Sequence, residues 1–231
     1  MASVCLGIGP YFAMVIENLG DRALLLRELP AELRPWQAAA CLRAAAIPGA
    51  IEVVSSFATV AVLFEEPGDE AERQAAVMLA IGAGGAASHG ARRFEVPVCY
   101  ELGEDLDAVA GELGRTATEV IAFHTGTEYE VQAIGFRPGF PYLGYLPPEL
   151  AGVARRPSPR PRVPAGSIGI ARDQTGIYPE ACPGGWALIG RTPYSIVDVG
   201  RAWFPLSPGD RIRFRSIDRN EFERLQGEAL A

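Results

Sequence analysis

Residues Gly135–Pro147 read GFRPGFPYLGYLP, a stretch in which aromatic residues alternate with glycine and proline. Proline breaks a helix interior and cannot donate a hydrogen bond to a strand ladder, so this spacing predicts neither a helix nor a regular strand. We expect instead a stiff, preshaped hydrophobic rim that contacts a partner or closes over a small molecule. Its aromatic side chains predicted to meet a partner are Phe140, Tyr142 and Tyr145.

The sequence that follows this stretch keeps the same character. Thirteen of the 19 prolines lie between residues 135 and 209. Strand-like segments remain between the breakers, at residues 167–171, 186–191, 195–199 and 211–217. Many short strands bounded by Gly and Pro turns predict a β-barrel or a β-sandwich.

The segment before this stretch supplies two further strands and two helices. Strands are predicted at 94–100 and 128–134, and apolar residues at helical spacing predict a helix over 106–113. Thr116 and Glu119 have the spacing of a capping box, which predicts a short second helix that carries His124.

The first third of the chain predicts a compact α/β unit. Strands are expected at 12–16, 23–26, 51–54 and 59–64, with one helix starting at Pro35 and another after Asp69. The order ββαββα is typical of helices layered on a small sheet. Residues 82–90, GAGGAASHG, are rich in small residues, so we place a linker there and expect His89 to be solvated. The predicted fold class is α+β, with an α/β domain over residues 1–84 and a barrel domain over 85–231.

Composition excludes several classes of function. A net charge of -7 argues against nucleic acid and anionic membranes as partners, and no apolar run is long enough to span a bilayer. The four cysteines are scattered, which indicates reduced thiols and a cytoplasmic protein. All 21 basic residues are arginine, so a Walker A loop, a lysine Schiff base and a Ser-Lys pair are excluded. With two histidines and no H-E-x-x-H motif, no metal site is predicted.

Three blocks of this sequence resemble one protein family. They are residues 135–147, residues 155–193 (RRPSPRPRVPAGSIGIARDQTGIYPEACPGGWALIGRTP) and residues 207–214 (SPGDRIRF). The family contains the B subunit of the bacterial 5-oxoprolinase, subunit 1 of allophanate hydrolase and a sporulation-kinase inhibitor. The resemblance covers the whole chain and implies a small α/β domain followed by a cyclophilin-like β-barrel. One departure is Cys182, where a serine is expected.

The resemblance implies a subunit of an ATP-dependent 5-oxoprolinase. Such an enzyme opens the lactam 5-oxoproline to glutamate, with ATP and Mg²⁺ as cofactors and with subunits A and C as partners. This chain is then expected to be inactive alone. The alternative is a regulatory protein that inhibits a sensor histidine kinase, and prolyl isomerisation rests on fold analogy only.

The catalytic candidates are His124 and Arg162. A histidine on an amphipathic helix either packs in the core or acts as an acid or base, and arginines in a proline-rich segment either bind phosphates or form a solvated loop. Arg191 suits a planar carboxylate but could form an internal salt bridge, and Ser167 could serve as a ligand contact or a turn residue. The predicted substrate-binding residues are Phe136, Arg160, Ser167, Gln174, Tyr178 and Arg191.

Overall fold

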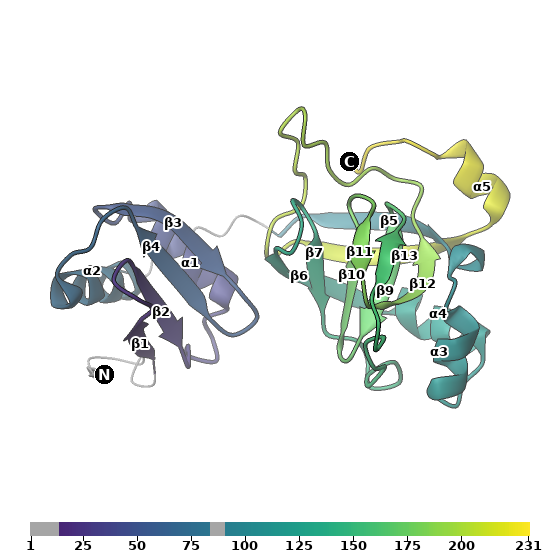
Figure 1. Ribbon diagram of the computed structural model, residues 1–231, viewed down its shortest axis with the longest axis horizontal. Helices are drawn as coiled ribbons and strands as arrows, with labels where there is room; N and C mark the ends of the chain where they lie inside the picture. The colour runs from purple at the N-terminus through teal and green to yellow at the C-terminus, as the bar shows by residue number, and fades with distance from the viewer. Residues whose placement is uncertain (1–13, 84–90) are drawn as a thin grey trace. The chain divides into compact units, whose positions relative to one another are not determined.

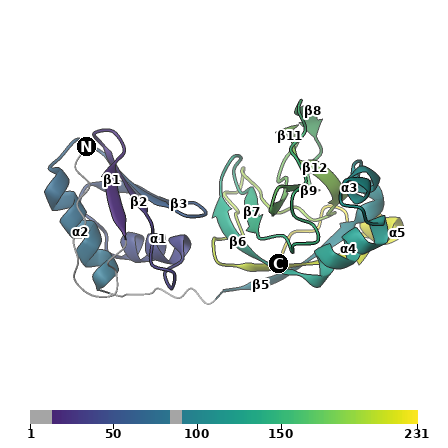
Figure 2. The same ribbon diagram turned by 90° about the horizontal axis from the view of Figure 1, so that it is seen from below.

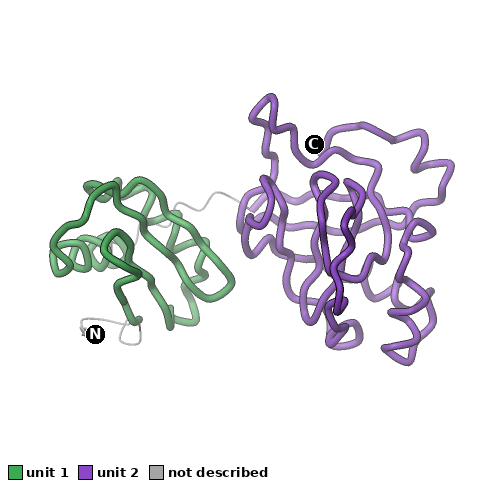
Figure 3. The backbone as a smooth tube through the Cα atoms, in the orientation of Figure 1, with its two compact units in different colours: residues 1–90 green, residues 91–231 purple. Residues whose placement is uncertain are grey.

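The computed structural model describes residues 14–83 and 91–231, and the chain divides into two compact units, residues 1–90 and 91–231 (Figure 3). The predicted boundary between residues 84 and 85 lies at the edge of a stretch outside the described residues. His89, Phe12 and Ala13 also lie outside them.

The first unit has the predicted order of elements. They are β1 (Val15–Asn18), β2 (Ala23–Arg27), α1 (Pro35–Ala44), β3 (Ala50–Ser55), β4 (Val60–Phe64) and α2 (Glu70–Gly82). The four strands form an antiparallel sheet in the order β1-β2-β4-β3, so the ββαββα prediction is confirmed. Both helices cover one face of this sheet (Figure 2).

Local sequence explains where these helices begin and what they bury. The Asp69 carboxylate accepts a hydrogen bond from the backbone N–H of Glu72 at 2.9 Å, which caps α2. Pro35 occupies the first turn of α1, where its missing N–H costs nothing. Leu42 of α1 and Val77 of α2 then pack against the buried sheet residues, which include Leu24, Leu26, Val60, Val62 and Phe64.

The second unit is built around a closed β-barrel (Figure 1). Its elements are β5 (Arg93–Cys99), η1 (Tyr100–Leu102), α3 (Leu106–Glu112), α4 (Ala117–Gly126), β6 (Glu128–Ile134), β7 (Pro141–Gly144), β8 (Arg160–Val163), β9 (Ser167–Ala171), β10 (Gln174–Ile177), β11 (Cys182–Gly184), β12 (Ala187–Arg191), β13 (Arg211–Ile217) and α5 (Arg219–Arg224). Seven strands close the barrel in the order β10-β7-β6-β13-β5-β12-β9. The predicted α+β class with a C-terminal barrel is confirmed.

Strands β8 and β11 do not join the barrel. They pair with each other as a separate two-stranded sheet, with Val163 opposite Cys182 and Arg160 opposite Gly184. We use the name ribbon for residues 155–163 and 182–185. Figure 2 shows β8 and β11 standing out from the barrel.

Two local predictions about strands were wrong. Residues Pro141–Gly144 do form a strand, β7, because Pro141 is its first residue, a position where a strand tolerates a missing N–H. Residues 195–199 do not form one. The Asp198 carboxylate there accepts a hydrogen bond from the backbone N–H of Arg201 at 3.0 Å, and this turn competes with strand pairing.

The barrel tolerates no side chain at Gly103, which lies between η1 and α3. A Cβ there would overlap the carbonyl group of Ile189 and lie 2.8 Å from the backbone nitrogen of Gly190. We expect Gly103→Ala to lower the free energy of unfolding by about 3 kcal/mol, at the upper end for overpacking. The control is Gly111→Ala in α3, where a Cβ meets nothing within 4 Å. It should raise stability by about 0.5–1 kcal/mol in urea unfolding. Equal effects would contradict this packing.

Candidate functional site

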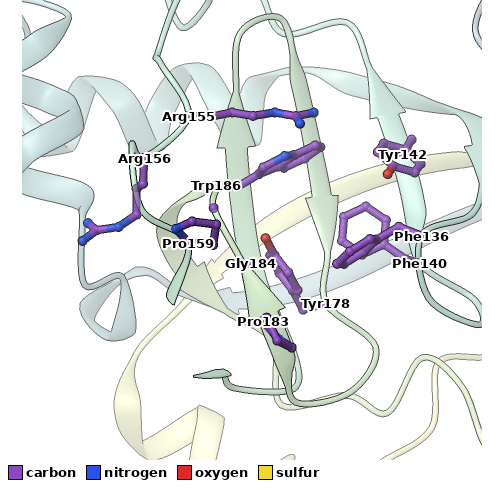
Figure 4. Close-up of a pocket in the computed structure, with 11 residues that line it drawn as sticks. Phe136, Phe140, Tyr142, Arg155, Arg156, Pro159, Tyr178, Pro183, Gly184 and Trp186 are labelled. Atoms are coloured by element: carbon purple, nitrogen blue, oxygen red, sulfur yellow. The ribbon is translucent and has the colours of Figure 1, made fainter. Parts of the chain in front are cut away.

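A pocket of about 330 Å³ lies between the barrel and the ribbon (Figure 4). It is lined by Phe136, Phe140, Tyr142, Arg155, Arg156, Pro159, Tyr178, Pro183, Gly184, Gly185 and Trp186. A mostly apolar concavity with a few polar groups is the usual form of a small-molecule site, and this volume is at the small end of the range.

The aromatic side chains of this pocket are organised around Phe140. Its ring makes edge-to-face contacts with four other aromatic rings at centroid distances of 4.9–5.7 Å, from Phe136, Tyr142, Tyr178 and Trp186. Two glycines make room for these rings. A Cβ at Gly176 would lie 2.9 Å from the Phe140 ring, and one at Gly184 would lie 2.5 Å from the Tyr178 hydroxyl oxygen.

Phe136 reaches the pocket through an unusual backbone conformation. It has φ 66°, in the left-handed region that side chains rarely adopt, and its side chain is 58% exposed. The turn is closed by a hydrogen bond from the backbone N–H of Phe140 to the carbonyl oxygen of Arg137 at 3.0 Å. The result is an exposed aromatic ring held at the edge of the pocket.

Arg155 supplies positive charge at this pocket. Its guanidinium carbon lies 5.9 Å from the centroid of the Trp186 ring, and Figure 4 shows the side chain extended across that ring. The side chain of Arg156 points away from the pocket. Burial raises the pKa of Tyr178 to about 12, and the nearby Arg155 charge opposes that rise only in part. The Arg155 guanidinium beside aromatic walls suits an anion with a flat, apolar body.

His124 lies inside the barrel, with no exposed surface. Its ring stacks on Phe214 with centroids 4.5 Å apart. The Nδ1 atom lies 2.7 Å from the Tyr100 hydroxyl, and Nε2 lies 3.1 Å from Oγ1 of Thr175. Since the Thr175 hydroxyl donates to the carbonyl oxygen of Gly169, it accepts from Nε2–H, and Nδ1 accepts from Tyr100. Burial lowers the pKa of His124 to about 3, so the ring is neutral.

The model of the family named carboxyltransferase domain, subdomain C and D, matches residues 14–205. The chain belongs to this family. It is similar to the B subunit of 5-oxoprolinase from Bacillus subtilis (strain 168), with 35% identity over 235 residues, covering 93% of this chain and 97% of that protein. The family that the sequence motifs predicted is therefore confirmed.

Two further comparisons place this carboxyltransferase-family chain among its relatives. It is 49% identical over 126 residues to the B subunit of 5-oxoprolinase from Escherichia coli O157:H7, covering 53% of this chain and 57% of that protein. The crystal structure of TTHA0988 superimposes with a TM-score of 0.72 at 38% identity, covering 85% of this chain. The matched part spans 40% of the length of the TTHA0988 chain.

The carboxyltransferase-family barrel brings four of the predicted site residues together. Phe136, Phe140, Tyr142 and Tyr178 all line the pocket, although Phe140 and Tyr142 were expected at a partner interface. Tyr145 lies outside the lining and is 52% exposed.

The other predicted residues lie away from the pocket. Ser167 is buried in β9, and Gln174 is half-buried at the start of β10. Arg191 donates from Nε to the carbonyl oxygen of Ala165 at 2.9 Å. Arg160 pairs with Asp105, and Arg162 is exposed on β8. Their roles at a site stay predictions.

The pocket also contains residues to which the sequence analysis gave no site role. These residues are Trp186 and Arg155, neither of which was singled out from the segment around it. Both lie at the junction of the ribbon and the barrel, a junction that local patterns do not show. Both residues lie in the block 155–193 that carries the family resemblance, but the block does not indicate which of its residues form a site.

The next question is whether the described residues could bind ATP together with its metal ion. Within residues 14–83 and 91–231, no group of three or more His, Cys, Asp or Glu side chains is placed to hold a metal ion. A volume of about 330 Å³ with aromatic walls suits a small ring better than a nucleotide with its phosphates. The pocket alone therefore does not fit MgATP.

Within residues 14–83 and 91–231, no helix combines the length and apolar character required to cross a membrane.

Proposed function

We propose that this chain is a subunit of an ATP-dependent 5-oxoprolinase, which opens 5-oxoproline to glutamate together with subunits A and C. The observation that carries the proposal is the similarity along nearly the whole chain to a protein named as the B subunit of 5-oxoprolinase. The proposal includes the partner subunits, the reaction and a cytoplasmic location.

The pocket supports this proposal because its chemistry suits the substrate. 5-Oxoproline is a small, flat ring that carries one carboxylate. The exposed Arg155 guanidinium provides a charged donor for that carboxylate, and the Phe140 and Trp186 rings provide apolar walls for the ring. Tyr178 is protonated at neutral pH, and burial raises its pKa further, to about 12.

Lactam opening needs more than binding, since amide resonance leaves the carbonyl unreactive. In the proposed reaction the γ-phosphoryl group of ATP would be transferred to the lactam oxygen with release of ADP, and water would then add to the activated carbon, so that the C–N bond breaks and phosphate leaves. We place the metal and the nucleotide phosphates with a partner subunit, because the pocket does not fit MgATP. The described residues of this chain bind and orient the lactam. We assign His124 a role in the packing of the barrel and none in the reaction.

Reconstitution tests this function. The chain is co-expressed with candidate subunits A and C, and glutamate formation from 5-oxoproline and ATP is measured with each protein omitted in turn. We expect glutamate only when all three are present. Folded partners that form glutamate equally well without this chain, or no glutamate from the full set, would contradict the proposal. The second outcome would favour the kinase-inhibitor alternative, which is tested by kinase autophosphorylation.

A further inference from the structure

The ribbon forms one side of the pocket but is not part of the barrel sheet. Arg155, Arg156, Pro159, Pro183, Gly184 and Gly185 of the ribbon line the pocket. A two-stranded ribbon is marginally stable in isolation, so its position depends on what anchors it. Val163 and Cys182 anchor one end by packing in the cluster that contains Phe140 and Trp186.

The arginine-rich side of the ribbon is anchored mainly by the carboxylate of Asp105. Its Oδ1 atom accepts from Nη2 of Arg160 at 2.6 Å and lies 3.4 Å from Nη1 of Arg156. Its Oδ2 atom accepts from the backbone N–H of Leu188 in β12 at 2.7 Å. The backbone N–H of Asp105 donates to the carbonyl oxygen of Leu188 at 2.9 Å. Asp105 is therefore fixed to the barrel and holds two ribbon arginines.

The position of Asp105 in the chain would suggest a different role. It precedes α3 at the N-cap position, where aspartate commonly accepts from the helix N–H groups. Here the side chain makes no capping bond. Both of its oxygens are instead directed to the ribbon and to β12, so helix capping does not account for this side chain.

Arg160 depends on this carboxylate for its burial. Its side chain is 15% exposed, and Nη1 is buried without a partner among the described residues. Its other ion pair, from Nε to Glu104 at 3.3 Å, involves a carboxylate that is 56% exposed. Without the Asp105 charge, the Arg160 guanidinium would pair only with the exposed Glu104 carboxylate. It would then move out into water, because an unpaired buried charge is unfavourable.

We propose that Asp105 is a positioning residue for the pocket: it fixes the ribbon to the barrel and so sets where Arg155 stands relative to Trp186. Asp105 is not part of the pocket lining. Its effect on a ligand passes through the backbone of Arg156, whose side chain it holds and which is adjacent to Arg155 in the chain. The effect on 5-oxoproline rests on the proposed function, whereas the effect on the ribbon does not.

The test compares Asp105→Asn with Asp107→Asn, an exposed carboxylate in the first turn of α3. Asparagine keeps an acceptor for the Leu188 N–H but loses the charge that holds the arginines. Hydrogen exchange of the full chain, followed by mass spectrometry, should be at least about tenfold faster over residues 156–163 in Asp105→Asn. Exchange over β5, β6 and β13 should be unchanged, and Asp107→Asn should match the parent protein throughout.

Two further variants separate positioning from loss of folding. Arg156→Gln removes the longer of the two ion pairs from an exposed side chain and should produce a smaller increase over the same residues. Asp105→Glu restores the charge and should recover part of the protection. Unchanged exchange in the ribbon of Asp105→Asn, or an equal increase throughout residues 91–231, would overturn the proposal.

The reconstituted complex adds a functional readout. Asp105→Asn should raise KM for 5-oxoproline about tenfold with kcat within about twofold, because the pocket geometry changes and the reacting groups do not. Faster ribbon exchange with an unchanged KM would refute the positioning role while leaving the oxoprolinase proposal intact. No activity in the parent complex would contradict the proposed function, and the exchange experiment would still decide whether Asp105 fixes the ribbon.

Discussion

Replacement of Arg155 by methionine is expected to lower kcat/KM for 5-oxoproline about 100-fold in the reconstituted complex. Methionine retains an apolar chain that can lie on Trp186, but it removes the charged donor at the pocket. A 100-fold loss corresponds to about 2.7 kcal/mol, which is within the range of about 1.5–3 kcal/mol for a hydrogen bond to a charged group. The measurement is initial-rate glutamate formation at saturating ATP.

Two other arginines make this prediction specific. Arg213→Met changes an exposed residue of β13 and should leave kcat/KM within about threefold of the parent value, as for most surface changes. Arg162→Met tests the sequence-based catalytic assignment, because Arg162 is exposed on β8 and lies outside the pocket lining. If Arg162→Met loses 100-fold and Arg155→Met does not, the site lies on the outer face of the ribbon and our assignment is wrong.

Acid should destabilise this protein between pH 6.5 and about 3, with His124 as one identifiable cause. Folding lowers the pKa of His124 from 6.5 to about 3, because its ring is buried. Over that interval the unfolded chain binds a proton that the folded chain does not. The contribution of His124 to the free energy of unfolding is therefore constant above pH 6.5, and it decreases as the pH is lowered below that value. The limiting slope is about 1.4 kcal/mol per pH unit for one site, so the full effect is about 4–5 kcal/mol.

Substitution of His124 by glutamine isolates this contribution. Glutamine can accept from Tyr100 and donate to Thr175, but it does not titrate and it loses the stacking on Phe214. We expect a loss of about 1–3 kcal/mol at pH 7 and a smaller decline than the parent between pH 6.5 and 4, in urea unfolding. His89→Gln, at the only other histidine in the sequence, should retain the parent slope. Parallel profiles for His124→Gln and the parent would contradict a buried, neutral His124.

The elements that sequence predicted well are those whose signals are local. The capping box is one example: the Thr116 hydroxyl accepts from the backbone N–H of Glu119, and the Glu119 carboxylate accepts from the N–H of Thr116. Both bonds form within four residues, so their spacing alone places the start of α4. The strands 128–134, 167–171 and 211–217 were likewise found at their observed limits, because each is an apolar or alternating run between breakers.

The elements that sequence missed depend on partners distant in the chain. Strand β8 was not predicted because RPRV has no strand pattern, and it forms only through pairing with β11. Similarly, the role of Asp105 depends on arginines 51 and 55 residues later in the chain. A residue just before a helix predicts a cap unless the tertiary structure offers it stronger partners.

At the candidate site, sequence likewise predicted the types of residue but not how they are arranged. The aromatic stretch at 135–147 was expected to form a hydrophobic rim, and Phe136, Phe140 and Tyr142 do line the pocket. Choosing Arg155 over Arg160 and Arg162 was not possible from sequence. All three lie in one proline-rich segment, and only the fold places the first at Trp186 and the second at Asp105.

Binding of 5-oxoproline at the pocket is the central claim, and Trp186 provides a direct probe of it. Of the three tryptophans in the sequence, Trp36 and Trp203 can be replaced by phenylalanine, and the emission of Trp186 is then the difference from the same complex in which Trp186 is also phenylalanine. The reconstituted complex is then titrated with 5-oxoproline, with and without Arg155→Met. We predict a saturable change in emission that is lost, or shifted about 100-fold to higher concentration, in the Arg155 variant. A complex that forms glutamate while its Trp186 emission does not respond to 5-oxoproline would contradict binding at this pocket.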